Sequence, residues 1–280
     1  MMRATEADRA DIEAFLSPQA ERAMFPLNNL LHHGMAGGHP FAVTMWLARQ
    51  GGKITDILTH SDGGMVMPVL PSGDYAAAAC TLQGREIEGI IGPRDWARCL
   101  ETALGLTSAP KSLDHDEPHF ALALSDLTLP DGPGQIVPMS DAPADLIKSW
   151  MLDYQLATLN TPPDRATLRV QDSYATYTTN RSHVVLMDEG TPLAMTGFNA
   201  QLPDIVQIGG VYTPPHLRGQ GHARRAVALH LAQVRTRGVR RATLFSASDM
   251  AARAYRAIGF RQIGDWSLIL LRNKETLPCP

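Results

Sequence analysis

The sequence has 280 residues, of which 44% are hydrophobic and 19% are charged, a composition ordinary for a globular protein with a packed core. Its formal net charge of -3 excludes a general electrostatic affinity for nucleic acid or for an anionic membrane surface. The length suits about two average domains.

The cysteines and the first residues bear on the cellular location. Cys80, Cys99 and Cys279 are odd in number, far apart and without a C-x-x-C pair, so they predict neither a disulfide framework nor a zinc site. The opening MMRATEADRADIEAFL mixes acidic with apolar residues, unlike a signal peptide. No run of about 18 uncharged apolar residues is present. We expect a soluble cytoplasmic protein with no metal, no nucleic-acid partner and no membrane partner; the oligomeric state stays open.

A stretch rich in proline and glycine, PDGPGQIVP at residues 130–138, marks the clearest boundary. Such a segment can form neither a helix nor a central strand. We therefore predict one domain over residues 1–130, a linker over 131–138 and a second domain over 139–280.

The first domain shows periodic segments but no motif with chemical content. The expected helices cover 6–16, 19–32 and 94–104, and the expected strands cover 42–49, 54–59, 65–70 and 119–124. The sequence DHDEPH at residues 114–119 lacks the H-E-x-x-H spacing of a zinc helix, and Pro118 would interrupt such a helix. We interpret these residues as an acidic solvated loop.

The second domain has a sharper pattern. The expected helices cover 140–159, 164–179, 221–237 and 250–258, and the expected strands cover 183–187, 193–199, 204–212, 242–246 and 261–271. Asp188-Glu189-Gly190 predicts a hairpin turn between the first two strands, and Gly238 and Gly259 predict helix ends. The order α-α-β-β-β-α-β-α-β indicates an α/β fold with a mixed sheet.

The stretch from Val211 to Arg224 is the one that carries chemistry. A strand stops at two prolines, and the chain then turns through a loop with Gly219 and Gly221 into the start of a helix. The first turn of a helix has N–H groups without intrahelical partners and a partial positive charge. Glycines let the backbone approach a ligand, and Arg218 and Arg224 add charge for phosphate oxygens. The stretch therefore predicts a pyrophosphate site.

Two common nucleotide motifs do not fit this stretch. A dinucleotide-binding fingerprint needs a third glycine where Arg224 stands and an acidic residue where Arg240 and Arg241 stand. A P-loop needs Gly-Lys-Ser/Thr, which the stretch lacks.

The stretch instead resembles the coenzyme A signature R-x-x-G-x-G/A of the GNAT superfamily of N-acetyltransferases, matched by Arg218, Gly221 and Ala223. Residues 248–260, SDMAARAYRAIGF, look like the closing helix of these enzymes, with Tyr255 four residues before Gly-Phe. The resemblance covers about residues 136–271 and implies a GNAT fold that uses acetyl-CoA as acyl donor.

The phrase GGVYTPPHLRGQG is similar to that of a bacterial subgroup whose N-terminal half is a degenerate second copy of the fold. Residues 1–130 would be that copy, with residues 84–92 leading to the helix where the signature would lie. They contain no R-x-x-G-x-G/A, so the resemblance implies a tandem GNAT-like fold in which the C-terminal copy alone is intact.

The resemblance implies a role for each residue of the two motifs. The backbone of Val211, Tyr212 and Thr213 would hold the thioester carbonyl and the pantetheine arm. N–H groups of the loop and the first helical turn would hold the pyrophosphate, namely those of Arg218, Gly219, Gln220, Gly221, His222, Ala223 and Arg224. Tyr255 would donate a proton to the departing thiolate. Ser248, where family enzymes usually have asparagine, would lie near the coenzyme.

The acceptor and the general base are not fixed by the sequence. An amine with a pKa of about 10.4 costs about 4–5 kcal/mol to deprotonate at neutral pH, and Asp172, Asp249 and His183 are candidate bases with no spacing that selects one. The acceptor side would contain three aspartates, Asp153, Asp164 and Asp172. Their charges favour a cationic acceptor, but a position on the exposed surface explains them equally well. His230 lies on an apolar helix stripe and is interpreted as a core residue.

Three functions stay open. The leading interpretation is an N-acetyltransferase that transfers acetyl from acetyl-CoA to a primary amine of a small molecule by direct attack in a ternary complex. A non-catalytic coenzyme-binding or regulatory module would need the same loop but no thiolate acid, so Tyr255 separates the two. A protein-lysine acetyltransferase would need an exposed peptide groove, which a sequence does not reveal.

Overall fold

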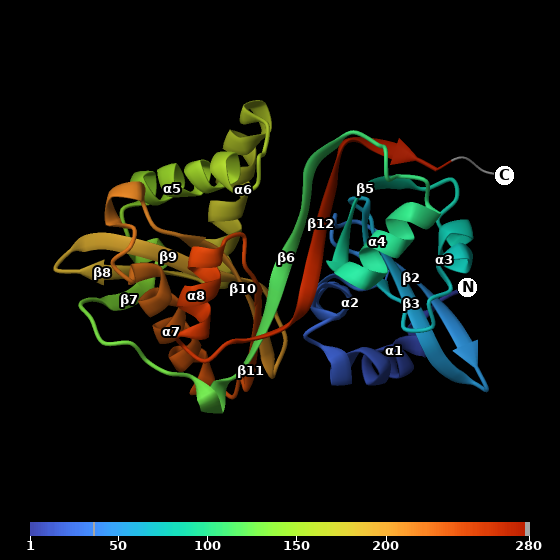
Figure 1. The fold of residues 1–280 in the computed structure, drawn as a ribbon, viewed down its shortest axis with the longest axis horizontal. Helices are drawn as coiled ribbons and strands as arrows, with labels where there is room; N and C mark the ends of the chain where they lie inside the picture. The colour runs from blue at the N-terminus through green and yellow to red at the C-terminus, as the bar shows by residue number, and fades with distance from the viewer. Residues whose placement is uncertain (36, 278–280) are drawn as a thin grey trace. The chain divides into compact units, whose positions relative to one another are not determined.

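The computed structural model describes residues 1–35 and 37–277, and the chain divides into two compact units (Figure 1). Unit 1 consists of Met1–Glu117 and of the segment that begins at Gly264, and unit 2 consists of Pro118–Ile263. These bounds differ from the expected division at residues 130–138, because strand pairing and not local composition sets them. Cys80 and Cys99 are exposed free thiols, and Cys279 lies outside the described residues.

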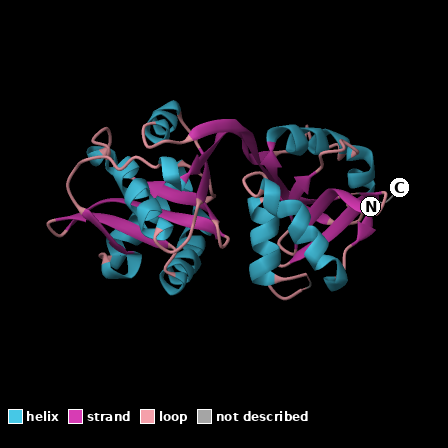
Figure 2. Ribbon diagram, turned by 90° about the horizontal axis from the view of Figure 1, so that it is seen from below, coloured by secondary structure: helices cyan, strands magenta, loops and turns pink. Residues whose placement is uncertain are grey.

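Unit 2 is built on a mixed sheet with helices on both of its faces (Figure 2). Its helices are α5 (Ala144–Ala157), α6 (Pro163–Asn180), α7 (His222–Arg235) and α8 (Asp249–Arg256). Its strands follow the order β6 (Lys111–Ala123), β11 (Arg241–Phe245), β10 (Ile205–Tyr212), β9 (Thr191–Gln201), β8 (His183–Asp188) and β7 (Gln135–Pro138). Strands β10 and β11 are parallel, and the other neighbours are antiparallel. The expected order of elements is confirmed, and β7 is an edge strand within the expected linker.

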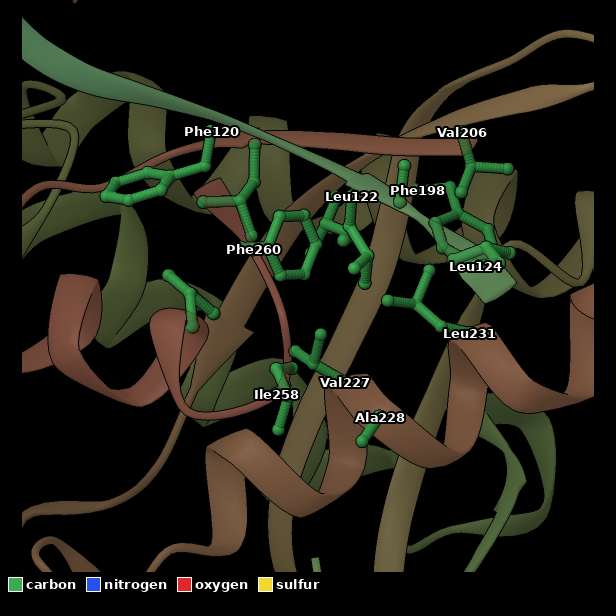
Figure 3. Close-up of a cluster of buried hydrophobic side chains, with 14 of the residues drawn as sticks. Phe120, Leu122, Leu124, Phe198, Val206, Val227, Ala228, Leu231, Ile258 and Phe260 are labelled. Atoms are coloured by element: carbon green, nitrogen blue, oxygen red, sulfur yellow. The ribbon is translucent and has the colours of Figure 1, made fainter. Parts of the chain in front are cut away.

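Alternation along the strands gives this sheet two apolar faces. On one face α7 and α8 pack on a cluster drawn in Figure 3, which includes Phe120 of β6, Leu231 of α7 and Phe260. On the other face α5 and α6 pack on a cluster that includes Trp150 and Val185. The binding loop between β10 and α7 is thus anchored at both ends in a packed core.

The strands of unit 1 also pair in a mixed, mainly antiparallel arrangement. Its helices are α1 (Arg9–Leu16), α2 (Met24–His33), α3 (Tyr75–Thr81) and α4 (Arg94–Ala103). Its strands follow the order β1 (Met2–Arg3), β2 (Val43–Gln50), β3 (Lys53–Ser61), β4 (Met65–Val69), β5 (Glu86–Pro93) and β12 (Arg261–Thr276), with β4 and β5 parallel. Two of these elements were not predicted from the sequence. Helix α3 has only 7 residues, and strand β5 contains glycine and proline.

The order of elements in the first part of the chain repeats in the second. Each repeat runs through an edge strand, two helices, three antiparallel strands, a helix, a strand parallel to the third, another helix and a last strand. The last strand of the first repeat, β6, pairs with β11 through His119–Ala123. The last strand of the second, β12, pairs with β5 through Trp266–Thr276. This pairing is why a cut at residues 130–138 misses the compact units.

Residues 114–119 are part of strand β6, so the expected acidic loop is wrong. Asp114 and Asp116 share a face of the strand, and both bind the guanidinium of Arg98, at 2.6 and 2.8 Å. Asp116 also accepts a hydrogen bond from Ser267 at 2.6 Å. The two acids are therefore paired with arginine on an exposed part of the strand. His119 is buried, with Nε2 2.7 Å from Oγ1 of Thr243.

No helix in the described part of the chain combines the length and apolar character needed to cross a membrane.

Candidate functional site

Strand β10 leaves its parallel neighbour before it ends. Its pairing with β11 covers Ile205–Gln207, whereas its pairing with β9 continues to Tyr212. The register with β9 shifts between Gly209 and Tyr212, and Gly210 has a φ of +60°. The bulge turns this part of β10 away from β11. The backbone of Val211, expected to hold the thioester, lies in that segment.

The loop after β10 leads directly into the N-terminus of α7. Gly219 and Gly221 have φ values of +80° and +83°, which only glycine adopts readily. Gly221 is the N-cap of α7, no side chain caps this end, and the first turn contains no acidic residue. A Cβ on Gly219 would meet nothing within 4 Å. The helix therefore begins with N–H groups that no side chain caps, two residues after the open position at Gly219 and beside the guanidinium of Arg224, an arrangement that suits an anion.

Polar side chains around the loop are only partly satisfied. Arg218 donates from Nε to the carbonyl of Thr213 at 3.0 Å and lies 5.9 Å from the ring of Tyr212. Within the described residues, Oγ1 of Thr213 and Nε of Arg224 are buried without a hydrogen-bond partner. Unpaired buried donors are uncommon in folded proteins and indicate a missing partner. Their place beside the open N-terminus of α7 fits an anionic ligand.

Arg225, the neighbour of Arg224, has a different task. Its guanidinium donates to the carbonyls of Pro130, Pro133 and Gly134, at 2.6, 2.8 and 3.1 Å. It therefore fixes the segment before β7 to the first turn of α7. Sequence patterns do not reveal this role, because the three acceptors are backbone atoms about ninety residues away.

Helix α8 carries the two other predicted site residues. Ser248 is the N-cap of this helix, and its hydroxyl accepts a hydrogen bond from the N–H of Ala251 at 3.2 Å. The observed partner of Ser248 is thus the helix itself. Tyr255 is 7% exposed, and its ring meets that of Phe260 edge-on at 6.0 Å. Tyr255 and Val211 contact the same apolar cluster, which brings the two predicted motifs to one core.

The candidate bases lie in different surroundings. Asp172 and Asp249 are exposed, on α6 and at the start of α8. His183 is buried, and burial lowers its pKa to about 3. His230 is a core residue as expected, stacked on Phe198 at 4.0 Å, and burial lowers its pKa to about 3 also. Neither imidazole is protonated at neutral pH.

On the acceptor side one of the three aspartates reaches the binding strand. The hydroxyl of Tyr212 donates to Oδ2 of Asp153 on α5 at 2.9 Å. Burial and the Asp153 carboxylate together raise the pKa of Tyr212 to about 12, so the phenol stays a donor. Asp164 and Asp172 are exposed on α6.

Comparison with known proteins identifies the fold around this site. Residues 145–260 match the family model described as acetyltransferase (GNAT) family, a segment that contains β10, α7 and α8. The chain contains a GNAT acetyltransferase domain. No curated protein matches the sequence.

Solved structures share the fold of the GNAT domain and of most of the chain. A Drosophila protein aligns with 97% of this chain and 98% of its own, with a TM-score of 0.64 and 12% identity. A GCN5-related N-acetyltransferase from Sphaerobacter thermophilus aligns with 99% and 95%, with a TM-score of 0.59 and 14% identity. A GNAT-family acetyltransferase from Colwellia psychrerythraea aligns with 97% and 100%, with a TM-score of 0.53 and 14% identity. At these identities the likeness concerns the fold.

Proposed function

We propose that the protein is an N-acetyltransferase that transfers the acetyl group of acetyl-CoA to a primary amine of a small molecule. The observation that carries the proposal is the uncapped N-terminus of α7 behind the Gly219–Gly221 loop, at the end of a strand that has parted from β11. It lies within the segment that matches the acetyltransferase family.

The residues present fit coenzyme A. The unpaired Thr213 hydroxyl and Arg224 Nε are donors near the loop, and the N–H groups of Arg218–Arg224 suit a pyrophosphate. The backbone of Val211–Thr213 would hold the thioester carbonyl and the pantetheine arm. Bound acetyl-CoA supplies a thioester, whose acetyl carbon an amine can attack directly.

The proton transfers fall to residues of the chain. Tyr255 would donate a proton to the sulfur, and it would have to do so from a largely buried position. The amine proton would leave through water to a base that we do not assign, because His183 is too weak a base and Asp172 and Asp249 are exposed. Asp153 would attract a cationic acceptor towards the end of β10.

Unit 1 would be a degenerate copy that cannot bind the coenzyme at the corresponding place. The helix of unit 1 that corresponds to α7 is α3, so residues 70–74 and not 84–92 stand where the signature would lie. The N-cap of α3 is Asp74, which accepts a hydrogen bond from the N–H of Ala77 at 3.0 Å. A carboxylate there occupies a helical N–H group and repels phosphate.

A matched pair of glycine variants tests the coenzyme site. Gly219 and Gly238 both have positive φ values, +80° and +98°, and a Cβ meets nothing within 4 Å at either. Gly219→Ala and Gly238→Ala therefore carry the same backbone strain of about 1–2 kcal/mol. We expect Gly219→Ala to raise the Kd for acetyl-CoA by about tenfold, with Gly238→Ala close to wild type. Equal Kd values would contradict the site.

A thermal-shift measurement first tests whether acetyl-CoA stabilises the protein. Turnover is then assayed with a panel of amines, and the free CoA thiol that is released is measured. A wild-type protein that acetyl-CoA does not stabilise would overturn the proposal. Stabilisation without turnover on any amine would favour a binding module instead. Robust turnover of lysine peptides over small amines would favour a protein acetyltransferase.

A further inference from the structure

A buried histidine lies beneath the bulge of the binding strand. His183 begins β8, is 1% exposed, and pairs by Cα position with Gly197 of β9, which in turn pairs with Gly209 of β10. Nδ1 of His183 is 2.9 Å from Oγ of Ser182. The ring stacks on Tyr177 of α6, with centroids 3.6 Å apart and planes 12° apart. The imidazole is thus held between α6 and the sheet.

Two glycines make room for this ring. A Cβ on Gly197 would overlap the imidazole, and a Cβ on Gly210 would lie 2.9 Å from Nε2 of His183. The ring therefore crosses β9 at Gly197 and ends against the bulge residue Gly210. This packing needs glycine at 197 for space, although its backbone is not in the left-handed region.

The nitrogen of the ring that faces the bulge, Nε2, makes no hydrogen bond to the described part of the chain. It is also buried. Burial lowers the pKa of His183, so the imidazole is neutral, and His230 and Tyr177 are the titratable groups that act on it or touch it. A buried polar atom without a partner costs stability, and phenylalanine would fill a similar volume without that cost. The nitrogen therefore points to a role outside folding.

We propose that His183 is a positioning residue for acyl transfer, whose ring supports the β10 bulge and whose Nε2 completes its hydrogen bonding there when an acyl thioester is bound. The inference rests on the proposed function, since the bulge is where Val211 would hold the thioester. Because the same ring stacks on Tyr177, it joins the donor strand to α6, which lines the acceptor side. Its partner is the bulge backbone or a water molecule held against it.

Three variants separate a polar role from simple packing. His183→Phe keeps a ring to stack on Tyr177 but removes both nitrogens, and His183→Gln keeps a polar atom near the position of Nε2. His230→Phe is the matched control, because His230 is also buried, also stacked on an aromatic ring and also has a nitrogen, Nδ1, without a partner among the described residues. It lies on α7 and stacks on Phe198 of β9, whereas the ring of His183 lies against Gly210 of the bulge.

We expect His183→Phe to keep or raise the melting temperature and yet to lower kcat by about tenfold, the effect of one hydrogen bond. The preference for acetyl-CoA over CoA in binding should fall, with the Kd for CoA unchanged. His183→Gln should recover part of both, and His230→Phe should leave both at wild-type values. Wild-type kcat and preference in His183→Phe would overturn the inference, as would equal losses in His230→Phe.

Amide hydrogen exchange without added coenzyme gives a readout that does not depend on activity. Peptides covering residues 208–212 should exchange faster in His183→Ala than in His230→Ala, because the bulge loses the ring that lies against Gly210. Equal exchange would overturn the support role. A wild-type protein that does not bind acetyl-CoA would instead defeat the proposed function, and the exchange experiment would still decide whether His183 holds the bulge.

Discussion

The hydroxyl of Tyr212 donates a hydrogen bond to the carboxylate of Asp153 at 2.9 Å, which connects the last residue of β10 to α5. Tyr212 lies one residue after Val211, where the thioester is proposed to bind, and Asp153 is exposed to solvent. One hydrogen bond thus links β10, the strand proposed to hold the acyl donor, to Asp153, one of the three aspartates proposed for the acceptor side.

Charge removal at Asp153 tests its part in acceptor binding. Asp153→Asn can still accept from Tyr212 but has no charge, so we expect the KM of a cationic acceptor to rise by about tenfold with an unchanged KM for acetyl-CoA. Asp164→Asn, on the exposed start of α6, is the control and should change neither constant. Steady-state kinetics with both substrates varied decides. Equal effects of the two variants would remove Asp153 from the acceptor site.

The features that could be predicted from the sequence are those with a local cause. Asp188-Glu189-Gly190 forms the expected hairpin turn, with positive φ at Glu189 and Gly190. Gly238 and Gly259 lie three residues after the last residues of α7 and α8, with φ values of +98° and +107°. The strand, glycine loop and helix of residues 205–235 were predicted as a unit, because prolines, glycines and apolar periodicity all act within a few residues.

The features that could not be predicted depend on pairing across long separations. The last strand of each repeat, β6 or β12, pairs with a strand of the other repeat. Arg224 and Arg225 look alike in the sequence. Their roles differ because the guanidinium of Arg225 donates hydrogen bonds to backbone carbonyls of the segment before β7. Glycine is required at position 197 because the ring of His183 occupies the space of a Cβ. The strand patterns of the two segments do not show that these residues meet.

The two adjacent arginines of α7 should separate binding from stability. Arg225→Ala loses three charge-assisted hydrogen bonds and should lower the free energy of unfolding by about 2 kcal/mol or more, with little change in the Kd for acetyl-CoA. Arg224→Ala removes a buried Nε that has no hydrogen-bond partner among the residues described, so the stability of this variant should be near wild type while its Kd for acetyl-CoA rises by about tenfold. Urea unfolding and calorimetric titration measure the two quantities. The reverse assignment would mean that Arg225 holds the phosphates.

Two of the buried histidines, His183 and His230, predict that the stability depends on pH in the acid range. Their folded-state pKa is about 3, below the ordinary value of 6.5, because burial favours the neutral ring. The unfolded chain therefore binds more protons between these values, and the stabilisation present above pH 6.5 is lost as the pH falls towards 3. Each histidine contributes a slope of up to about 1.4 kcal/mol per pH unit.

His183→Phe and His230→Phe should each lower the slope of unfolding free energy against pH by up to about 1.4 kcal/mol per pH unit, because each variant takes up about one proton fewer on unfolding. Urea unfolding between pH 4.5 and 6.5, above the range in which most carboxylates titrate, measures it. A slope unchanged in both variants would show that neither imidazole is kept neutral by the fold.

Replacement of Tyr255 by phenylalanine tests the proposed acid without disturbing the core. The ring is 7% exposed and packs against Phe260, so Tyr255→Phe keeps the apolar contacts and removes only the hydroxyl. We expect kcat to fall by about 10²-fold, the lower range for general acid catalysis, with an unchanged Kd for acetyl-CoA and a melting temperature close to wild type. Phe260→Leu, which alters the packing but keeps the hydroxyl, controls for a displaced ring. Unaltered kcat in Tyr255→Phe, with a good acceptor under single-turnover conditions, would show that the thiolate leaves without a proton from Tyr255.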